Sequence, residues 1–250
     1  MKFLHKTKWL LPLILTFNCS TEEAGDKSDT DSSNQAIELV DVNAQRQGYL
    51  CVPEGNGPFP VVVYNHGGLG DALGGPPEDT CTALREEGYL GFSMLRRETV
   101  PIQGHSDDVD AGIAYALAHA KADADRFAIL GYSRGGYLSF VALTEHSEIK
   151  VGVIMAPAPV NGLLDAALPD ADEVEATTLV LVAENDLPQF NNENEDHVAT
   201  ATAVHQALQN ATKESQLEIL DAFADNGHDL FQEVRDEYWT QITTFLANKL

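Results

Sequence analysis

Ser133 is the residue of this chain best placed to act as a nucleophile. It lies in "GYSRGG", after the apolar run "RFAILGY" and before a segment with helical character. A serine in a G-x-S-x-G turn from strand to helix is exposed on a strained backbone, and the helix N-terminus favours developing negative charge beside it. Gly131 and Gly135 are expected here because a Cβ atom would collide with the neighbouring helix or strand. The same pattern also occurs in ordinary glycine-rich turns, so other groups of a catalytic site are needed.

A serine hydroxyl becomes a nucleophile when a base accepts its proton, and histidine is the usual base. Of the eight histidines, His228 lies in "ADNGHDLF", a polar turn between the strand-like "SQLEILDAF" and the last helix. His105, in the loop after "YLGFSML", is the second candidate. Four others fall within or beside predicted helices, where packing or exposure to solvent is expected: His119, His146, His197 and His205. His228 is therefore the predicted base.

The base in turn needs a carboxylate that holds its tautomer and stabilises its cation. Asp186 follows the apolar run "TTLVLVA" in "ENDLP", whereas the alternatives Glu184 and Asp196 lie nearer the strand and at a helix start. The chain has 39 acidic residues, so a lone aspartate carries little information. The order Ser133, Asp186, His228, with each residue after its own predicted strand, is what indicates a catalytic triad.

Backbone N–H groups are also needed to stabilise the oxyanion of a tetrahedral intermediate. The run "VVVYNHGGLG" places His66, Gly67 and Gly68 at the end of a predicted strand, where glycines let amides approach a ligand. Arg134, directly after the serine, offers a second N–H. His66 is expected to brace this loop and not to act as a second base.

These candidates depend on strands that end at one edge of a sheet. Apolar runs alternate with helical patterns, which predicts an α/β fold with a mostly parallel central sheet and helices on both faces. Functional residues of such sheets gather at the C-terminal ends of the strands. Ser106 is expected to cap a helix over residues 106–122, and residues 229–249 are predicted as one last helix. The predicted strands are "QGYLCVP", "PVVVYN", "YLGFSML", "RFAILGY", "KVGVIMAPA", "TTLVLVA" and "SQLEILDAF".

Four motifs in this order, "GPFPVVVYNHGG", "GYSRGG", "LVAEND" and "NGHDLF", make the chain resemble the α/β-hydrolase family. Within that family it is most similar to the dienelactone-hydrolase-like and prolyl-oligopeptidase-like serine hydrolases. The resemblance implies an α/β-hydrolase fold with Ser133 as nucleophile, His228 as base and Asp186 as acid. It also implies that the amides of Gly68 and Arg134 form the oxyanion hole.

Two departures narrow the function that this resemblance implies. Dienelactone hydrolases carry cysteine where this chain has Ser133, and oligopeptidases carry a propeller domain where this sequence has only a polar segment. We therefore expect a serine hydrolase that cleaves small-molecule carboxylic esters through an acyl-enzyme intermediate. The alternatives are a peptidase or amidase of the same fold and a catalytically inactive binding lipoprotein. Residues 157–176 are expected to form a minimal lid of one short helix at most.

The Arg134 side chain, beside the nucleophile, has two candidate partners. A guanidinium can bind a substrate carboxylate through two parallel hydrogen bonds, and it can equally form a salt bridge with one of the many acidic residues of the chain.

The N-terminal residues resemble an export signal. Lysines precede the apolar stretch "WLLPLILTF", which is too short for a membrane span, and "LTFNCS" resembles a bacterial lipoprotein signal. We expect residues 1–18 to be a signal peptide, Cys19 to carry lipid, residues 19–35 to be a disordered tether and residues 36–250 to form a single domain. The protein is thus expected to be exported and lipid-anchored in the bacterial cell envelope, with a periplasmic or secreted protein as the alternative.

Cys51 and Cys81 remain as a pair if Cys19 is lipidated, in a compartment where disulfides persist. A disulfide between them and two buried thiols are both consistent with the sequence. The chain has no C-x-x-C or H-E-x-x-H pattern, and the acidic run "ENDLPQFNNENED" lacks the calcium-loop pattern. We therefore expect no metal and no cofactor.

The formal net charge of −24 argues against nucleic acid and against an anionic bilayer surface as direct binding partners. Contact with a membrane is accordingly expected only through the N-terminal lipid anchor.

Overall fold

A mixed β-sheet organises this protein. The computed structural model describes residues 37–68, 74–99, 102–192 and 194–250, and Gln35–Leu250 form one compact unit. The predicted signal peptide, Cys19 and tether lie outside the described residues. Within the described part the sheet has eight strands: β1 (Glu38–Asn43), β2 (Arg46–Cys51), β3 (Phe59–Asn65), β4 (Leu90–Met94), β5 (Ala122–Tyr132), β6 (Val151–Met155), β7 (Thr177–Ala183) and β8 (Ser215–Leu220).

The strand order is β1-β2-β4-β3-β5-β6-β7-β8. From β4 across to β8 every neighbouring pair is parallel, whereas β1 pairs with β2 and β2 with β4 in antiparallel fashion. The parallel strands β4 and β6 are buried along their whole length, as expected for strands covered on both faces. Because the parallel strands all point the same way, β3, β5, β7 and β8 end at one edge of the sheet.

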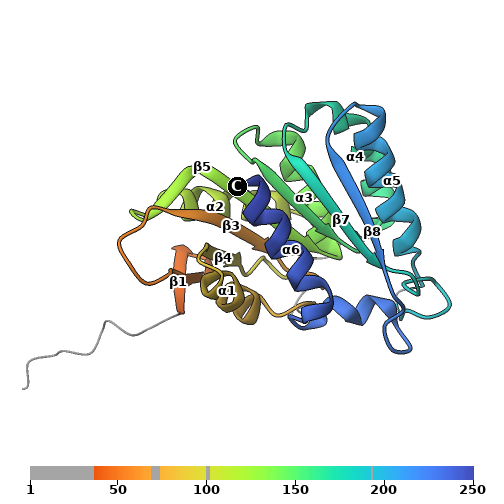
Figure 1. The fold of residues 1–250 in the computed structure, drawn as a ribbon, viewed down its shortest axis with the longest axis horizontal. Coiled ribbons are helices and arrows are strands. Elements are labelled where there is room, and N and C mark those ends of the chain that lie inside the picture. Colours follow the sequence, from red (N-terminus) through yellow and green to blue (C-terminus); the bar gives the residue numbers. More distant parts are fainter. Residues whose placement is uncertain (1–36, 69–73, 100–101, 193) are drawn as a thin grey trace, which may run out of the picture. The chain divides into compact units, whose positions relative to one another are not determined.

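Helices cover both faces of the sheet, with α1 and α6 in front of it and α2 and α3 behind it in the view of Figure 1. Their apolar residues, such as Leu84 of α1, Phe140 of α3 and Ile242 of α6, are fully buried against the strands. The helices are α1 (Pro77–Glu86), α2 (His105–Leu117), α3 (Arg134–Glu145), α4 (Leu163–Ala167), α5 (His197–Asn210) and α6 (Asp236–Lys249), with short 3₁₀ segments η1 (Val160–Gly162), η2 (Leu168–Glu173) and η3 (Gly227–Gln232).

The predicted α/β fold with a mostly parallel sheet and helices on both faces is confirmed, and several details differ from the prediction. The antiparallel strand β1 was not predicted, because its exposed edge position leaves little apolar signal. The helix predicted from Ser106 begins at His105 after Gly104, whose left-handed φ of 79° fits glycine, so Ser106 is not the cap. It ends at Leu117, and the residues after it belong to β5.

The predicted last helix is interrupted. Residues 227–232 form the 3₁₀ segment η3, and α6 begins at Asp236 after extended backbone at Glu233 and Arg235. In the described part of the chain no helix has the length and apolar character that a membrane span requires.

Candidate active site

Ser133 lies at the sharp turn between β5 and α3. Its backbone has φ 55° and ψ −118°, a conformation that a residue with a side chain rarely adopts. Hydrogen bonds hold it there: the Ser133 N–H donates to the Met155 carbonyl at 2.9 Å, and its carbonyl accepts from Tyr137 at 3.1 Å and Ala158 at 3.0 Å. The neighbouring strand β6 and the start of α3 thus over-determine the strained conformation, as at a functional turn.

Gly131 and Gly135 let α3 approach the sheet closely. A Cβ atom on Gly135 would collide with the backbone of Asn65 and His66 at the end of β3, and one on Gly131 would collide with the Gly135 carbonyl. The steric role predicted for both glycines is confirmed. The close approach brings the end of β3 next to the nucleophile turn.

The structure brings Ser133, His228 and Asp186 together in one hydrogen-bonded chain. His228 Nε2 lies 3.0 Å from Ser133 Oγ, and His228 Nδ1 lies 2.8 Å from Asp186 Oδ2. His228 is only 3% exposed and Asp186 is fully buried. Burial favours the neutral form of the Asp186 carboxyl, but hydrogen bonds from His197 and His228 outweigh this and hold the pKa of Asp186 below its ordinary value. A buried, ionised carboxylate is therefore available to orient His228 and stabilise its cation.

The loops that carry His228 and Asp186 are fastened to one another. The Asn185 side chain donates to the Phe223 carbonyl at 3.2 Å and accepts from the Phe223 N–H at 2.9 Å. Gly227 is needed for this packing, because a Cβ atom there would lie 2.5 Å from the Asp186 nitrogen. The φ of Gly227 is not positive, so its close approach to Asp186, and not a left-handed turn, accounts for glycine at this position.

Tyr132 contacts His228 through both a hydrogen bond and its ring. Its hydroxyl donates to the His228 carbonyl at 2.9 Å and accepts from Gln232 Nε2 at 3.1 Å, and its ring centroid lies 4.9 Å from that of His228. Tyr132, the residue before Ser133, therefore packs against His228, the predicted base.

The alternative acidic residues do not contact His228. Glu184 is exposed, and Asp196 caps α5 by accepting from the Ala199 N–H at 2.8 Å.

The other two candidate histidines, His105 and His66, lie at other positions in the fold. His105 starts α2, where burial and then the charge of Arg96 lower its pKa to about 4. His66 lies against the loop after β3, with Nδ1 2.7 Å from the Gly67 carbonyl, and its own carbonyl accepts from Arg96 Nη2. Both histidines are buried, and neither forms a hydrogen bond with Ser133 or His228 among the described residues.

The loop after β3 passes beside Ser133. A Cβ atom on Gly67 would lie 3.1 Å from Ser133 Cβ, and the Gly67 N–H donates to the Gly74 carbonyl. Gly68 follows with φ 81°, in the left-handed region that favours glycine. Arg134 is the first residue of α3. The two predicted oxyanion amides therefore lie on the two segments that flank the nucleophile.

The Arg134 side chain is half-buried. Burial lowers the pKa of its guanidinium, and the charge of Glu195 acts in the opposite direction. Glu195 is thus an acidic residue of the chain itself that faces this arginine.

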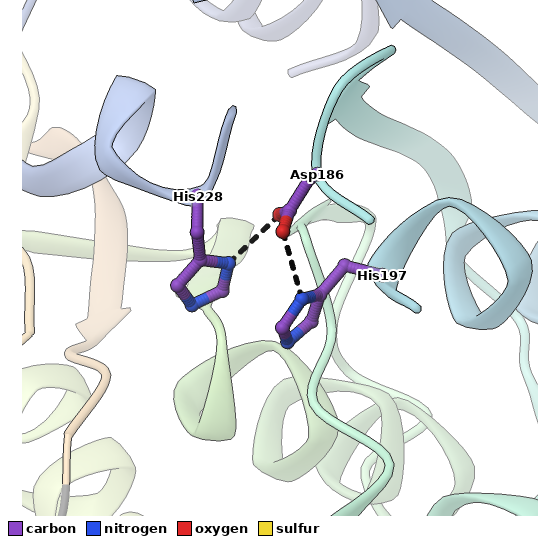
Figure 2. Close-up of side chains that lie close together, drawn as sticks. All are labelled: Asp186, His197 and His228. Atoms are coloured by element: carbon purple, nitrogen blue, oxygen red, sulfur yellow. Dashed lines mark hydrogen bonds and ion pairs between the residues drawn. The ribbon is translucent and has the colours of Figure 1, made fainter. Parts of the chain in front are cut away.

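His197, which the sequence analysis expected to be packed or exposed, also contacts Asp186. Figure 2 shows the rings of His197 and His228 both directed at the Asp186 carboxylate. His197 Nδ1 lies 2.9 Å from Asp186 Oδ1, and Asn191 Nδ2 donates to the same oxygen at 3.0 Å. The only signal in the sequence was the position of His197 at a helix start shortly after Asp186, and such positions are common.

Among the described residues, one group could surround a cation: Asp186, His197 and His228, with candidate ligand atoms within 4.8 Å of one another. Both carboxylate oxygens and both Nδ1 atoms are already paired with each other. We assign these atoms to the hydrogen-bond network of the triad and not to a metal.

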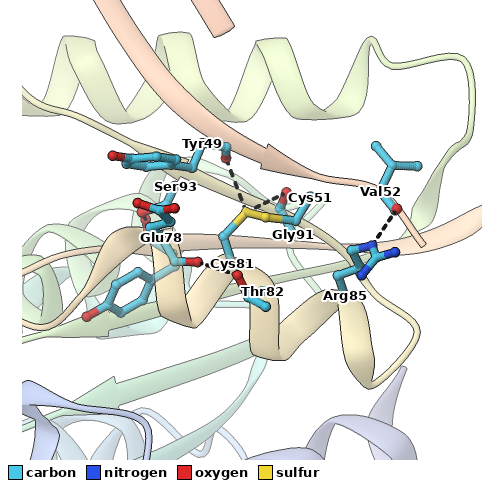
Figure 3. Close-up of a disulfide and its surroundings, with 10 residues drawn as sticks. Tyr49, Cys51, Val52, Glu78, Cys81, Thr82, Arg85, Gly91 and Ser93 are labelled. Atoms are coloured by element: carbon cyan, nitrogen blue, oxygen red, sulfur yellow. Dashed lines mark hydrogen bonds between the residues drawn. A yellow bond between two sulfur atoms is a disulfide. The ribbon is translucent and has the colours of Figure 1, made fainter. Parts of the chain in front are cut away.

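Cys51 of β2 and Cys81 of α1 form a disulfide (Figure 3). Their Cα atoms lie 5.7 Å apart, within the range that a disulfide allows, and both residues are fully buried. The bond joins the antiparallel end of the sheet to the helix that covers it.

The segment predicted as a minimal lid forms η1, α4 and η2, all short. Leu164 is fully buried and Leu163 is 40% exposed, so packing of α4 against the domain accounts for Leu164.

Comparison with solved structures places this fold among the α/β-hydrolases. A Klebsiella pneumoniae protein assigned to the dienelactone hydrolases is 18% identical, with a TM-score of 0.62 over 84% of this chain and 98% of its own. An acetyl xylan esterase from Paenibacillus sp. R4 is 15% identical, with a TM-score of 0.62 over 86% of this chain and 88% of its own. An acylaminoacyl peptidase from Pyrococcus horikoshii is 16% identical, with a TM-score of 0.65 over 86% of this chain, but this chain spans only 42% of the peptidase. At these identities the likeness shows the fold.

Sequence comparison identifies the family. No curated protein sequence gives a significant match. The sequence profile described as the dienelactone hydrolase family matches residues 95–248, the part that carries Ser133, Asp186 and His228. The chain is therefore a serine hydrolase of the α/β-hydrolase fold, and it belongs to the dienelactone hydrolase family.

Proposed function

We propose that this protein hydrolyses carboxylic esters of small molecules, with Ser133 as nucleophile, His228 as general base and acid, and Asp186 as the group that orients His228. The observation that carries the proposal is the continuous hydrogen-bonded chain from Ser133 Oγ to the buried Asp186 carboxylate, set on a strained turn.

The reaction follows from this geometry in two steps. His228 accepts the hydroxyl proton while Ser133 Oγ bonds to the ester carbonyl carbon, and the Gly68 and Arg134 amides stabilise the oxyanion. The carbon–oxygen bond to the alcohol then breaks as His228 protonates the leaving group, which leaves an acyl-serine. His228 next removes a proton from water, whose oxygen attacks the acyl carbon. The bond from that carbon to Ser133 Oγ then breaks as His228 returns the proton to Oγ, which releases the carboxylic acid and restores Ser133.

Two considerations favour esters over amides. An alcohol leaves more readily than an amine, so an acyl-serine mechanism without further assistance suits esters. In addition, two esterases are among the solved structures that share this fold, and this chain covers 88% and 85% of them.

A fluorophosphonate probe tests the nucleophile, because it bonds covalently to activated serines. We expect the folded wild-type protein to be labelled and to hydrolyse a chromogenic ester, and Ser133→Ala to do neither. Turnover of an aminoacyl anilide faster than of the matched ester would identify a peptidase instead. Absence of labelling in folded wild-type protein would identify a binding protein.

The esterase activity should survive treatment with EDTA. A loss of activity that calcium restores would contradict the expected absence of a metal.

Substitution of Arg134 tests whether its charge contributes to a preference for anionic over neutral esters. If its guanidinium binds a substrate carboxylate, Arg134→Gln should lower kcat/KM for an anionic ester relative to its neutral analogue. An unchanged preference would leave Arg134 as the partner of Glu195.

We further propose that the protein is exported and anchored by lipid on Cys19. The sequence pattern of residues 1–19 supports this, and the Cys51–Cys81 disulfide is consistent with an oxidising compartment. Expression of the full chain in a bacterial host with a labelled fatty acid should yield label on the wild-type protein and none on Cys19→Ala. A secreted protein without lipid would appear unlabelled in the medium or periplasm.

A further inference from the structure

Asp186 carries two histidines on its two carboxylate oxygens. His228 occupies Oδ2 at 2.8 Å, and His197 occupies Oδ1 at 2.9 Å. The two imidazole rings stack, with centroids 4.0 Å apart and planes inclined by 25°. A triad uses only the first of these histidines, so the mechanism described above leaves His197 without a function.

The backbone fixes His197 at this place. Its N–H donates to the Asp186 carbonyl at 3.1 Å, and α5 begins at this residue, capped by Asp196. Asn191 spans the loop between them, donating to Asp186 Oδ1 and exchanging hydrogen bonds with the Glu195 backbone. The ring of His197 therefore cannot leave the carboxylate without rearrangement of this loop.

The groups that face His197 favour its charged form. Two carboxylates contact it: Asp186, from the loop after β7, and Glu195, from the segment before α5, whose Oε2 lies 3.4 Å from His197 Nε2. The third neighbour is His228 of η3, whose ring stacks on the ring of His197. The charge of Glu195 also acts on Arg134 of α3, where it opposes the lowering of the pKa by burial. Burial alone would lower the pKa of His197, but the hydrogen bond to Asp186 and the ion pair with Glu195 outweigh it and raise the pKa to about 9.

An imidazolium in this position changes the electrostatic environment of His228. It compensates the charge of the carboxylate that would otherwise stabilise protonated His228, and it places a like charge beside the His228 ring. It also holds Oδ1, so that Oδ2 remains directed at His228 Nδ1.

We propose that His197 is a positioning residue of this active site: it holds the Asp186 carboxylate through Oδ1 and, as an imidazolium, places a positive charge against the ring of His228. The inference rests on the proposed function, since it concerns the base of that reaction. Its consequence is an esterase whose activity extends further to the acid side.

Two substitutions separate the charge of His197 from its hydrogen bond. His197→Asn retains a donor near the position of Nδ1 but no charge, and His197→Leu retains neither. For His197→Asn we expect the acid limb of the pH profile of kcat/KM to move up by about one pH unit, with the plateau within about threefold of wild type. For His197→Leu we expect the same movement and a plateau roughly tenfold lower.

The matched control is His205→Asn in the same helix α5, where the imidazole contacts Ser215 Oγ at 2.8 Å and lies outside the active site. Its acid limb should coincide with that of the wild type. An unchanged acid limb in folded His197→Asn would overturn the proposal.

Nitrogen NMR of the ¹⁵N-histidine-labelled protein tests the proposal without a substrate. The two ring nitrogens of His197 should show imidazolium shifts at pH 7. A neutral His197 at pH 7 in the wild-type protein would contradict the proposal even if no variant folds. Absence of ester hydrolysis at every pH would overturn the proposed function but leave this NMR test standing.

Discussion

At the scale of single residues, this site depends on which atoms share the Asp186 carboxylate. Two imidazoles and one amide meet two oxygens in a space closed to solvent, and each contact is within hydrogen-bonding distance. A buried carboxylate with this many donors stays ionised, because protonation would place an O–H donor opposite one of these donors and weaken the remaining hydrogen bonds.

The raised pKa of His197 predicts a pH-dependent contribution to stability. The pKa is about 9 in the folded protein against 6.5 for an unperturbed histidine, so the folded state binds this proton more tightly than the unfolded state. The stabilisation is complete below pH 6.5 and is lost as the pH rises through 9, and it amounts to at most about 3 kcal/mol.

Chemical denaturation at intervals between pH 6 and 10 measures this effect. The free energy of unfolding of the wild type should fall across that window by more than that of His197→Asn. Parallel curves for the two proteins would show that His197 does not hold a proton in the folded state at neutral pH.

At the scale of elements, the site is assembled by the contact of α3 with the end of β3. The helix starts one residue after the nucleophile, and its first turn lies directly against the backbone of Asn65 and His66. Because β3 leads into the loop with Gly67 and Gly68, this contact sets the distance between the nucleophile and one predicted oxyanion amide.

Gly135→Ala tests that contact. The new methyl group would overlap the Asn65 carbonyl, a backbone atom that cannot move alone, so we expect a loss of roughly 3 kcal/mol or more in stability and of most of the activity. Gly136→Ala is the comparison, since its nearest neighbours would lie at 3.1 Å and need to shift only slightly. Equal thermal stability and activity in the two variants would contradict this account.

The disulfide predicts a second effect at this scale. It closes a loop between residues 30 apart in sequence, β2 and α1, which in the chain-entropy account stabilises the fold by about 3–4 kcal/mol. The double variant Cys51→Ala/Cys81→Ala should therefore unfold at a clearly lower temperature than oxidised wild type.

Reduction of the unfolded wild-type protein by dithiothreitol, followed by refolding under reducing conditions, should reproduce that lower stability. A variant as stable as the oxidised protein would show that the bond adds nothing to the fold. The active-site residues lie at the other strands, so the catalytic constants of the folded variant should change little.

At the scale of the whole molecule, the dominant property is negative charge. The chain carries 39 acidic against 15 basic residues, and a formal net charge of −24 makes the folded protein repel itself and any anion that approaches. The family supports a small-molecule substrate, and both the family and this charge argue against nucleic acid as a partner.

Salt should therefore raise both stability and activity toward anionic substrates. Between about 20 mM and 500 mM NaCl the Debye length shrinks several-fold, and we expect the melting temperature to rise by roughly a few degrees. The kcat/KM of an anionic ester should rise over the same range, while that of a neutral ester of the same shape serves as the control and stays nearly constant. A melting temperature that falls with salt would show that attractive ion pairs outweigh the repulsion.

The sequence by itself determined the class of fold and the identity of the three residues in the proposed triad. Strand and helix patterns are local, and the order Ser133, Asp186, His228 after successive strands predicts convergence, because parallel strands end at one edge. The oxyanion segments and their flanking glycines could be predicted for the same reason. Boundaries that depend on weak local signals, at β1, at the start of α2 and at the break before α6, could not be.

Only the tertiary structure decided which side chains share Asp186 and that Cys51 and Cys81 are bonded. His197 lies at a helix start like many other residues, and its contact with the carboxylate depends on how the intervening loop folds back on itself. The cysteines are likewise joined because α1 packs over β2. Both contacts depend on how close two segments separated in sequence come in space. Local propensity and residue spacing do not encode that distance.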